Sequence, residues 1–427
     1  MNLTDEKGEG RASFFAALRH RDFRLMWGGQ VVSVTGSQMQ FVAINWHVYV
    51  LTKSSVALGM VGLARVLPII VCSLAGGVVA DAFDRKRLML ATQTLMLLSA
   101  ATLAAVTAAG VEQVWPIYAL TAVGAAAQAF DNPARQAMLP ALVPVRDFPN
   151  AVSLGFLAFQ FAMVSGPLLA GLVLANYGPA LVYGLNAVSF LAVVVAILLI
   201  RASGRPTRDE AEGETGARAL SFDALKEGLR FVWRTPVIVQ TMVLDFVATF
   251  FASATALLPI FAAEVLRVGE RGYGILSSAQ AVGAVAAGLL LARKAEWRRP
   301  GAWVILSVAV YGASTLLFGL SRVFWFSFLM LAVAGAADTV STVIRQTIRQ
   351  LITPDRLRGR MTSVNMIFFM GGPQLGEFEA GVLARWVGAP LSVVIGGAGC
   401  LVAAGVALLK SRELLRYRIP KGEEARA

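Results

Sequence analysis

The sequence predicts an all-α integral membrane protein, with twelve transmembrane helices in two pseudo-symmetric six-helix bundles. Three observations predict this fold. Only 15% of the residues are charged and 57% are hydrophobic, whereas a soluble domain has about 25% charged residues. Continuous apolar runs recur along the 427 residues, each near the roughly 20 residues that span a bilayer as a helix. Motifs of the first half also return in the second. A β-barrel is disfavoured because its strands would give short alternating segments.

Glycine, proline and charged clusters separate the apolar runs and set the predicted helix boundaries. The predicted helices are 23–50, 56–80, 88–109, 114–134, 150–175, 180–200, 237–262, 273–292, 302–320, 323–344, 362–386 and 390–410.

One long polar insert, "RASGRPTRDEAEGETGARA" (201–219), divides the predicted helices six and six. Its charge and its lack of bulky apolar residues predict flexibility. Apolar residues at helical spacing follow in 222–236 and predict an amphipathic helix on the membrane surface; the alternative is a soluble linker helix. The predicted division is a bundle at 1–200, a cytoplasmic linker at 201–236, a second bundle at 237–410 and a tail at 411–427.

Two short motifs repeat at about half the chain length. "RQAMLPALVP" (135–144) is echoed by "RQTIRQLITP" (345–354), and "GPLLAG" (166–171) by "GPQLGE" (372–377). A duplicated six-helix unit is typical of secondary transporters built from two related halves.

Basic residues are distributed very unequally between the two sides of the predicted membrane. One side, which includes both termini and the central insert, holds 32 of the 38 lysines and arginines, and the opposite side holds five. The positive-inside rule then places both termini in the cytoplasm. We therefore interpret the net charge of +12 as topology and contact with anionic lipid, and we expect no nucleic-acid partner.

The link between the second and third predicted helices, "GGVVADAFDRKRLM" (76–89), is short and highly charged. It resembles the signature G-x-L-A-D-R-x-G-R-R/K of the major facilitator superfamily, with matches at Gly77, Asp81, Arg85 and Lys86 and at Ala80, and departures at Val79, Ala82 and Asp84. The resemblance implies that Asp81 latches the two halves together.

The same resemblance implies partners for Asp81 at the cytoplasmic end of the fourth helix, Asp131 and Arg135. In the second half, Asp338 and Arg345 are the expected gating or structural pair, and Ala292 stands where a second Asp81 would fall. The alternative is that residues 81–87 only anchor helix ends. Asp84 is also a suitable N-cap for the third helix.

A second resemblance covers nearly the whole chain, from about 15 to 410. "AFDNPARQAMLPALVP" (129–144), "GYGIL" (272–276) and "GPQLGEFEAG" (372–381) are similar to the branch that contains enterobactin exporters and macrolide efflux pumps. "SGPLLAG" also resembles a motif of drug/proton antiporters, at Gly166, Pro167 and Gly171. Small residues there permit close helix packing, and Pro167 permits a bend. The resemblance implies a multi-pass protein of the bacterial inner membrane.

Ionisable residues at bilayer depth are costly and are therefore candidates for function. Glu377 and Glu379 lie in the eleventh predicted helix, and Asp245 lies in the seventh. Burial favours the protonated form of a carboxyl group, which suits reversible proton binding. Because Glu377 and Glu379 are two residues apart, they point in nearly opposite directions on a helix, and we expect at most one to carry protons. The alternative for each acid is a structural hydrogen bond or ion pair.

Polar residues inside the predicted helices are candidates for a substrate cavity. Four of them share one face of the first helix, and Arg65 could bind an anionic substrate or form a fixed ion pair. The candidates are Gln30, Ser33, Ser37, Gln40, Arg65, Asn186 and Gln280.

The sequence lacks the motifs of the main alternative classes. It has no GxxxxGK[ST] nucleotide-binding motif, no metal-ligand spacing and no nucleophile motif, so we expect no enzyme, no metal and no cofactor. The hypothesis is a monomeric exporter that uses a proton gradient to move an amphipathic siderophore or drug by alternating access. The alternatives are a nutrient importer of the same fold and a non-transporting membrane sensor or scaffold.

Overall fold

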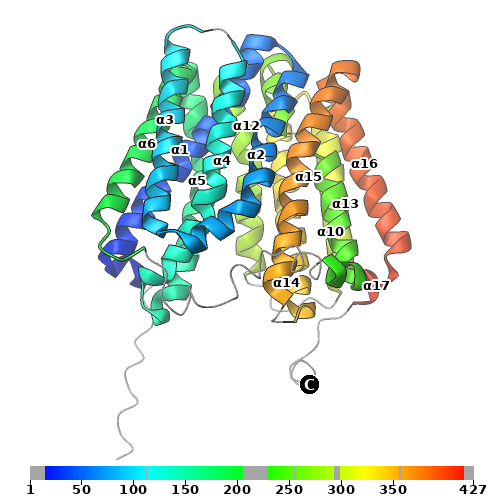
Figure 1. Ribbon diagram of the computed structural model, residues 1–427. Coiled ribbons are helices and arrows are strands. Elements are labelled where there is room, and N and C mark those ends of the chain that lie inside the picture. The colour runs from blue at the N-terminus through cyan, green and yellow to red at the C-terminus, as the bar shows by residue number, and fades with distance from the viewer. Residues whose placement is uncertain are drawn as a thin grey trace, which may run out of the picture.

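The computed structural model describes residues 15–111, 113–204, 229–253, 255–292, 299–354 and 357–417, except for the side chains of 73–78, 80–82, 358–360, 362–364 and 366–370. Every regular element within these residues is a helix. Long helices run roughly side by side, and the start of α1 and the end of α16 lie at the same end of the molecule (Figure 1). We call this the termini end, and the other the far end.

The first half of the chain contains six long helices, with one 3₁₀ turn before α1 and two between α4 and α5. They are α1 (Arg21–Thr52), α2 (Ser55–Ala82), α3 (Arg85–Ala108), α4 (Trp115–Met138), α5 (Phe148–Tyr177) and α6 (Pro179–Leu199). The 3₁₀ turns are Ala16–Arg19, Leu139–Ala141 and Val145–Asp147.

The second half is similar except at its start. Its helices are α10 (Pro236–Phe251), a 3₁₀ turn at Thr255–Leu257, α11 (Leu258–Ile260), a π-helix at Phe261–Val265, α12 (Gly269–Leu291), α13 (Pro300–Leu320), α14 (Phe324–Ile352), α15 (Arg358–Val387), α16 (Ala389–Lys410) and α17 (Arg412–Arg416).

Within the described residues, nine helical segments are long and apolar enough to cross a membrane. The helices α1, α4 and α15 have comparable lengths and lie outside these nine. Two of them, α1 and α4, contribute polar side chains to the cavity described below.

The seventh predicted helix, 237–262, is not continuous in the structure. The α-helix ends at Phe251, and residues 255–265 form a 3₁₀ turn, one short α-turn and a π-helix. Pro259 lies in this segment; it has no N–H to donate to the carbonyl of Thr255, and its ring clashes with that carbonyl in a regular helix. The expectation of one unbroken helix is therefore wrong.

Helices from the two halves of the chain make their most extensive contacts where α2 packs on α15 and α5 packs on α12. Glycines allow both contacts. A Cβ on Gly171 of α5 would lie 2.9 Å from the Cα of Gly274 in α12, and a Cβ on Gly381 of α15 would lie 3.1 Å from the Cα of Gly59 in α2. Close backbone approach through small residues is the usual basis of helix association in membranes.

The buried apolar core differs between the two ends of the molecule. At the far end one cluster joins both halves, with Val48 and Leu174 packed among the same residues as Phe261 and Leu276. At the termini end, the described core residues form separate clusters. The first half contributes residues such as Phe23, Met89 and Ile197 to one cluster, and the second half contributes Val304, Ile348 and Leu414 to another.

The charged link between α2 and α3 is held against the end of α6. Asp84 accepts hydrogen bonds from the backbone N–H groups of Lys86 (2.9 Å) and Arg87 (3.2 Å), so the predicted N-cap is confirmed. The Lys86 ammonium donates to the carbonyl of Ile200 at 2.6 Å, and the Arg85 guanidinium donates to that of Ala137 at 3.1 Å.

The predicted surface helix at 222–236 is described only from residue 229. Residues 229–234 are helical, and Val232 is buried against Ile238 and Met242 of α10. The prediction rests on four apolar positions: Leu229 is exposed, Val232 is buried, and Phe222 and Leu225 lie outside the described residues.

Candidate functional site

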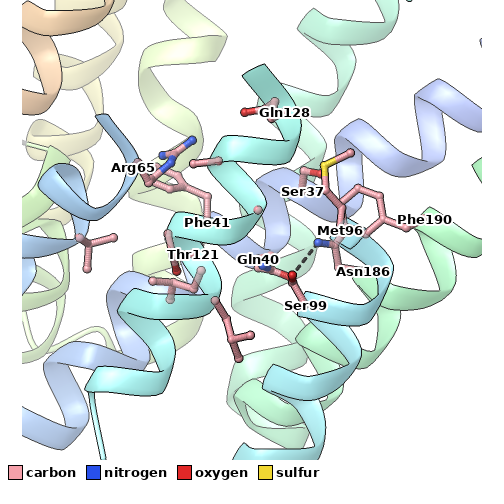
Figure 2. Close-up of a pocket in the computed structure, with 15 residues that line it drawn as sticks. Ser37, Gln40, Phe41, Arg65, Met96, Ser99, Thr121, Gln128, Asn186 and Phe190 are labelled. Carbon is pink, nitrogen blue, oxygen red and sulfur yellow. Dashed lines mark hydrogen bonds between the residues drawn. The ribbon is translucent and has the colours of Figure 1, made fainter. Parts of the chain in front are cut away.

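A cavity of about 90 Å³ lies among five helices of the first half of the chain. Figure 2 shows its lining side chains, which come from α1, α2, α3, α4 and α6. The polar members are Ser37, Gln40, Arg65, Ser99, Thr121, Gln128 and Asn186. Four of the seven cavity residues predicted from the sequence, Ser37, Gln40, Arg65 and Asn186, are therefore brought together in one place.

Two features give this cavity its chemistry. The Asn186 amide donates to the Gln40 side-chain oxygen at 2.8 Å, and Ser189 donates to the Asn186 side-chain oxygen at 2.9 Å. These bonds fix the amides of α1 and α6 against each other. On the opposite wall, the Arg65 guanidinium lies 4.3 Å from the centre of the Phe41 ring, a cation–π contact. The cavity thus presents a positive charge, an aromatic face and neutral amides together.

The other three predicted cavity residues lie elsewhere. Gln30 accepts a hydrogen bond from the Arg135 guanidinium, towards the termini end of α1. Ser33 is buried in α1. The backbone of Gln280 in α12 packs directly on Gly335 of α14. None of the three lines the cavity described above.

Glu377 of α15 lies at the contact between α2 and α15. Its carboxylate accepts a hydrogen bond from the Thr255 hydroxyl at 3.0 Å, and it interacts electrostatically with Arg65 of α2. The two helices are close here, since a Cβ added to Gly62 of α2 would lie only 3.0 Å from the Glu377 carboxylate. The predicted proton carrier and the predicted anion-binding arginine therefore lie on the two helices of this contact, one from each half of the chain, and interact electrostatically across it. Glu379 is half-buried and lies roughly 200° around the same helix.

Asp245, predicted to couple protons, and the predicted gating residues Asp338 and Arg345 form one cluster. Arg345 of α14 makes an ion pair with Asp245 of α10, and a second, longer contact of 3.9 Å with Asp338. The Arg345 and Asp245 side chains are 2% and 6% exposed, whereas that of Asp338 is 47% exposed. One buried arginine is thus shared by a buried acid and an accessible acid.

The predicted latch is only partly described. Asp131 is buried and accepts hydrogen bonds at 3.0 Å from both Thr92 and Gln93 of α3. Arg135 donates to Gln30 of α1 and, at 2.6 Å, to Asn132. The Asp81 side chain and the surroundings of Gly77 lie outside what the structure describes, so their latch role stays a prediction.

The repeated Arg-Gln motif has the same setting in both halves. Arg135 of α4 bonds to a side chain of α1, and Arg345 of α14 bonds to a side chain of α10, the helix that opens the second half. The acceptor is the neutral Gln30 in the first case and the charged Asp245 in the second.

The predicted helix-bend motif lies at two helix contacts. A Cβ on Gly166 would meet the side chain of Gln38 and the carbonyl of Thr35 in α1, and a Cβ on Gly274 would meet the carbonyl of Pro167. Gly171 packs on Gly274 as well. All three residues lie within α5, and a bend at Pro167 remains a prediction.

Sequence reasoning missed the side chains that close the far end. Tyr49 of α1 donates a hydrogen bond to the Glu264 carboxylate at 2.6 Å, and Tyr273 of α12 donates to the carbonyl of Val42 at 3.2 Å and stacks on Trp46 with ring centres 5.3 Å apart. Aromatic residues near the end of the first predicted helix were the available signal. Thr255 was also missed, because it lies inside an apolar run taken as regular helix.

Among the residues that the structure describes, no group of three or more histidine, cysteine or acidic side chains is placed to hold a metal ion.

Comparisons with known proteins agree with this fold. A family described as transmembrane secretion effector matches residues 12–426. The enterobactin exporter EntS of Shigella boydii serotype 18 is 25% identical over 399 residues, which cover 93% of this chain and 94% of the relative. EntS of Escherichia coli O81 is 24% identical over the same coverage.

Solved structures show the same fold at low identity. A bacterial homologue of the human lysosomal transporter Spinster, inward-facing and unoccupied, superimposes with a TM-score of 0.74 at 15% identity, covering 97% of this chain and all of that one. An inward-facing bacterial homologue of the iron transporter ferroportin gives 0.66 at 15% identity, covering 92% and 99%. The match along nearly the whole chain, together with this fold, identifies the protein as a multi-pass membrane transporter of the major facilitator superfamily and not an enzyme.

Proposed function

We propose that this transporter is a proton-coupled exporter of amphipathic small molecules, of siderophore or drug type, that works by alternating access. In this proposal α1–α6 and α10–α16 form two related six-helix bundles, which tilt against each other in the cytoplasmic membrane. Both termini lie in the cytoplasm, so the termini end is the inner end and the far end is the outer one.

The difference between the two ends of the molecule carries the proposal. At the far end the halves share one apolar core, and hydrogen bonds cross between them, such as the one from Arg271 to Asn176 at 3.1 Å. At the termini end the described core residues form separate clusters. A protein whose described core residues join the two halves at the far end is suited to exchange that contact for one at the other end.

The cavity favours an anionic, aromatic or otherwise amphipathic cargo. Arg65 supplies the positive charge, Phe41 the aromatic surface, and Gln40 with Asn186 the neutral hydrogen-bonding groups. Two relatives are named as exporters of enterobactin, and a catecholate siderophore would combine these properties. An anionic cargo at Arg65 would compete with Glu377 for the same guanidinium.

Proton coupling is supported by the position of Glu377 between the two halves. The carboxylate contacts Thr255 of its own half and interacts with Arg65 of the other. Protonation of Glu377 would remove the attraction to Arg65, and with it one link between α2 and α15. The cluster of Asp245, Arg345 and Asp338 is the second candidate for proton binding, because Asp338 is accessible and shares Arg345 with Asp245.

The test is transport of a catecholate siderophore in a strain that lacks its own exporters. We expect the wild-type chain to lower intracellular siderophore and raise it in the medium. We expect Arg65→Gln to reduce that export about tenfold, because a hydrogen bond to a charged group contributes about 1.5–3 kcal/mol. Arg322→Gln, at an exposed arginine beyond α13, is the matched control and should export normally. Siderophore accumulation inside the cells would contradict export and indicate an importer.

A further inference from the structure

The second half of the chain carries a groove of about 510 Å³ on the outside of the helix bundle, between α10 and α16. Its walls are apolar along most of their length, with Val243 and Val247 on α10 and Val402 and Val406 on α16. Val402 and Val406 are 66% and 47% exposed. In a membrane transporter these side chains face lipid, so the groove is filled by something apolar.

Polar groups in the groove are confined to one end. Gln240, Lys410 and Ser411 line the groove where α10 begins and α16 ends. Lys410 is exposed, and Arg412 follows it on the surface. The Gln240 side chain accepts the backbone N–H of Leu414 at 3.2 Å, which fixes the short segment after α16 beside the lysine. The groove is therefore a long apolar slot with a positive charge at its mouth.

The length of the slot is close to that of one lipid acyl chain. Eleven residues separate Gln240 from Phe251 on α10, and eleven separate Gly399 from Lys410 on α16. At the helical rise this is about 16 Å, close to half of the roughly 30 Å hydrocarbon core of a bilayer. A slot that starts at the headgroup level and ends near the midplane matches one acyl chain of one leaflet. A helix of a protein partner would cross the whole bilayer, so a groove that ends near the bilayer midplane would not be needed to bind it.

The end of the slot near the bilayer midplane is closed because α10 and α16 pack closely there. The Phe251 carbonyl packs directly on the backbone of Gly396, and a Cβ on Gly399 would lie 3.0 Å from the Phe251 ring. Because Gly399 has no side chain, the Phe251 ring lies against α16 at this depth and forms the blind end of the slot.

We propose that this groove binds an anionic phospholipid of the cytoplasmic leaflet, with one acyl chain between α10 and α16 and its phosphate at Lys410. The proposal shares only the orientation with the proposed function and does not depend on cargo or on coupling. A basic group at the cytoplasmic end of a groove between transmembrane helices is suited to an anionic headgroup, and exposed cationic side chains there add to the attraction.

Native mass spectrometry of the purified full-length protein, titrated with dioleoyl phosphatidylglycerol or dioleoyl phosphatidylethanolamine, tests this assignment. We expect phosphatidylglycerol to bind more tightly, and Lys410→Gln to weaken its binding about fivefold, the effect of one basic residue at a membrane surface. Phosphatidylethanolamine binding should change little. Lys410→Arg should restore phosphatidylglycerol binding.

A second pair of variants tests the groove itself. Val406→Trp fills the slot and should remove the bound phosphatidylglycerol. Val195→Trp on α6, where the valine is 46% exposed, and Arg201→Gln, just after α6, are the matched controls and should leave binding unchanged. Equal phosphatidylglycerol binding in wild type, Lys410→Gln and Val406→Trp would overturn the proposal. A dimer lost on Val406→Trp would also overturn it, because a second copy would then occupy the groove.

Discussion

At the scale of single residues, Glu377 connects three parts of the molecule. It belongs to α15, it accepts a hydrogen bond from Thr255 in the broken segment after α10, and it interacts electrostatically with Arg65 of α2. The sequence identified Glu377 and Arg65 separately, because any charge within an apolar run is costly. It could not pair them, because the two residues lie more than 300 positions apart and nothing local specifies that α2 packs on α15.

The neutral variant Glu377→Gln should therefore uncouple transport from the proton gradient. We expect siderophore transport in proteoliposomes to lose its stimulation by a pH gradient while exchange without a gradient continues, because the amide keeps the size of the side chain but cannot bind or release the proton. The measurement is transport rate with and without an imposed gradient.

Glu379→Gln is the control for this variant, since Glu379 lies two residues away on another face of α15. Its stimulation by the gradient should stay within about twofold of the wild-type value, a smaller change than the loss of one hydrogen bond would cause. Full stimulation in Glu377→Gln would contradict the assignment and move the coupling site to Asp245, Arg345 and Asp338.

At the scale of elements, the helix positions were predictable and the break after α10 was not. Long apolar runs bounded by glycine, proline and charge define α2, α3, α6 and α13 within a few residues. In the seventh predicted helix the apolar run continues through residues 252–260, so hydropathy gave no boundary. The break depends on Pro259 and on tertiary contacts, including the Ser253 hydroxyl donating to the carbonyl of Pro373 at 3.0 Å.

The contact between α5 and α12 gives a prediction at this scale. In Gly171→Leu the added Cβ would lie 2.9 Å from the Glu270 carbonyl and from the Cα of Gly274, so the far end could close only by displacing α12. Overpacking of this kind costs about 1–3 kcal/mol, which lowers the population of the sealed state roughly 5- to 150-fold when the open state carries no penalty.

The measurement is the rate at which a membrane-impermeant thiol reagent labels Leu276→Cys, in a chain whose Cys72 and Cys400 are replaced by alanine, since the native Leu276 side chain is only 1% exposed in the far-end core. Gly171→Leu should raise that rate. Gly155→Leu is the control on the same helix, because a Cβ on Gly155 meets nothing within 4 Å. Equal rates in the two variants would show that the glycine contact does not hold the far end closed.

At the scale of the whole molecule, the repeat in the sequence marks two arginines with similar contacts. Arg135 and Arg345 open the two copies of the Arg-Gln motif, and each bonds to the first long helix of its own half. The packing of α2 on α15 and of α5 on α12 could not be read from the repeat, because a repeat specifies each half and not how the halves meet. The contacts of Tyr49, Tyr273 and Trp46 at the far end form only where the two halves pack together, so they could not be predicted from the repeat either.

The most direct test of the account is a reversible cross-link across the far end. In the cysteine-replaced chain, Asn176→Cys and Arg271→Cys are joined by a short, reducible thiol cross-linker, since the native side chains lie within 3.1 Å of each other. Alternating access requires this seal to open in every cycle. We predict that cross-linking stops siderophore transport in proteoliposomes and that reduction restores it, while each single-cysteine chain is unaffected. Undiminished transport by the cross-linked protein would contradict the account.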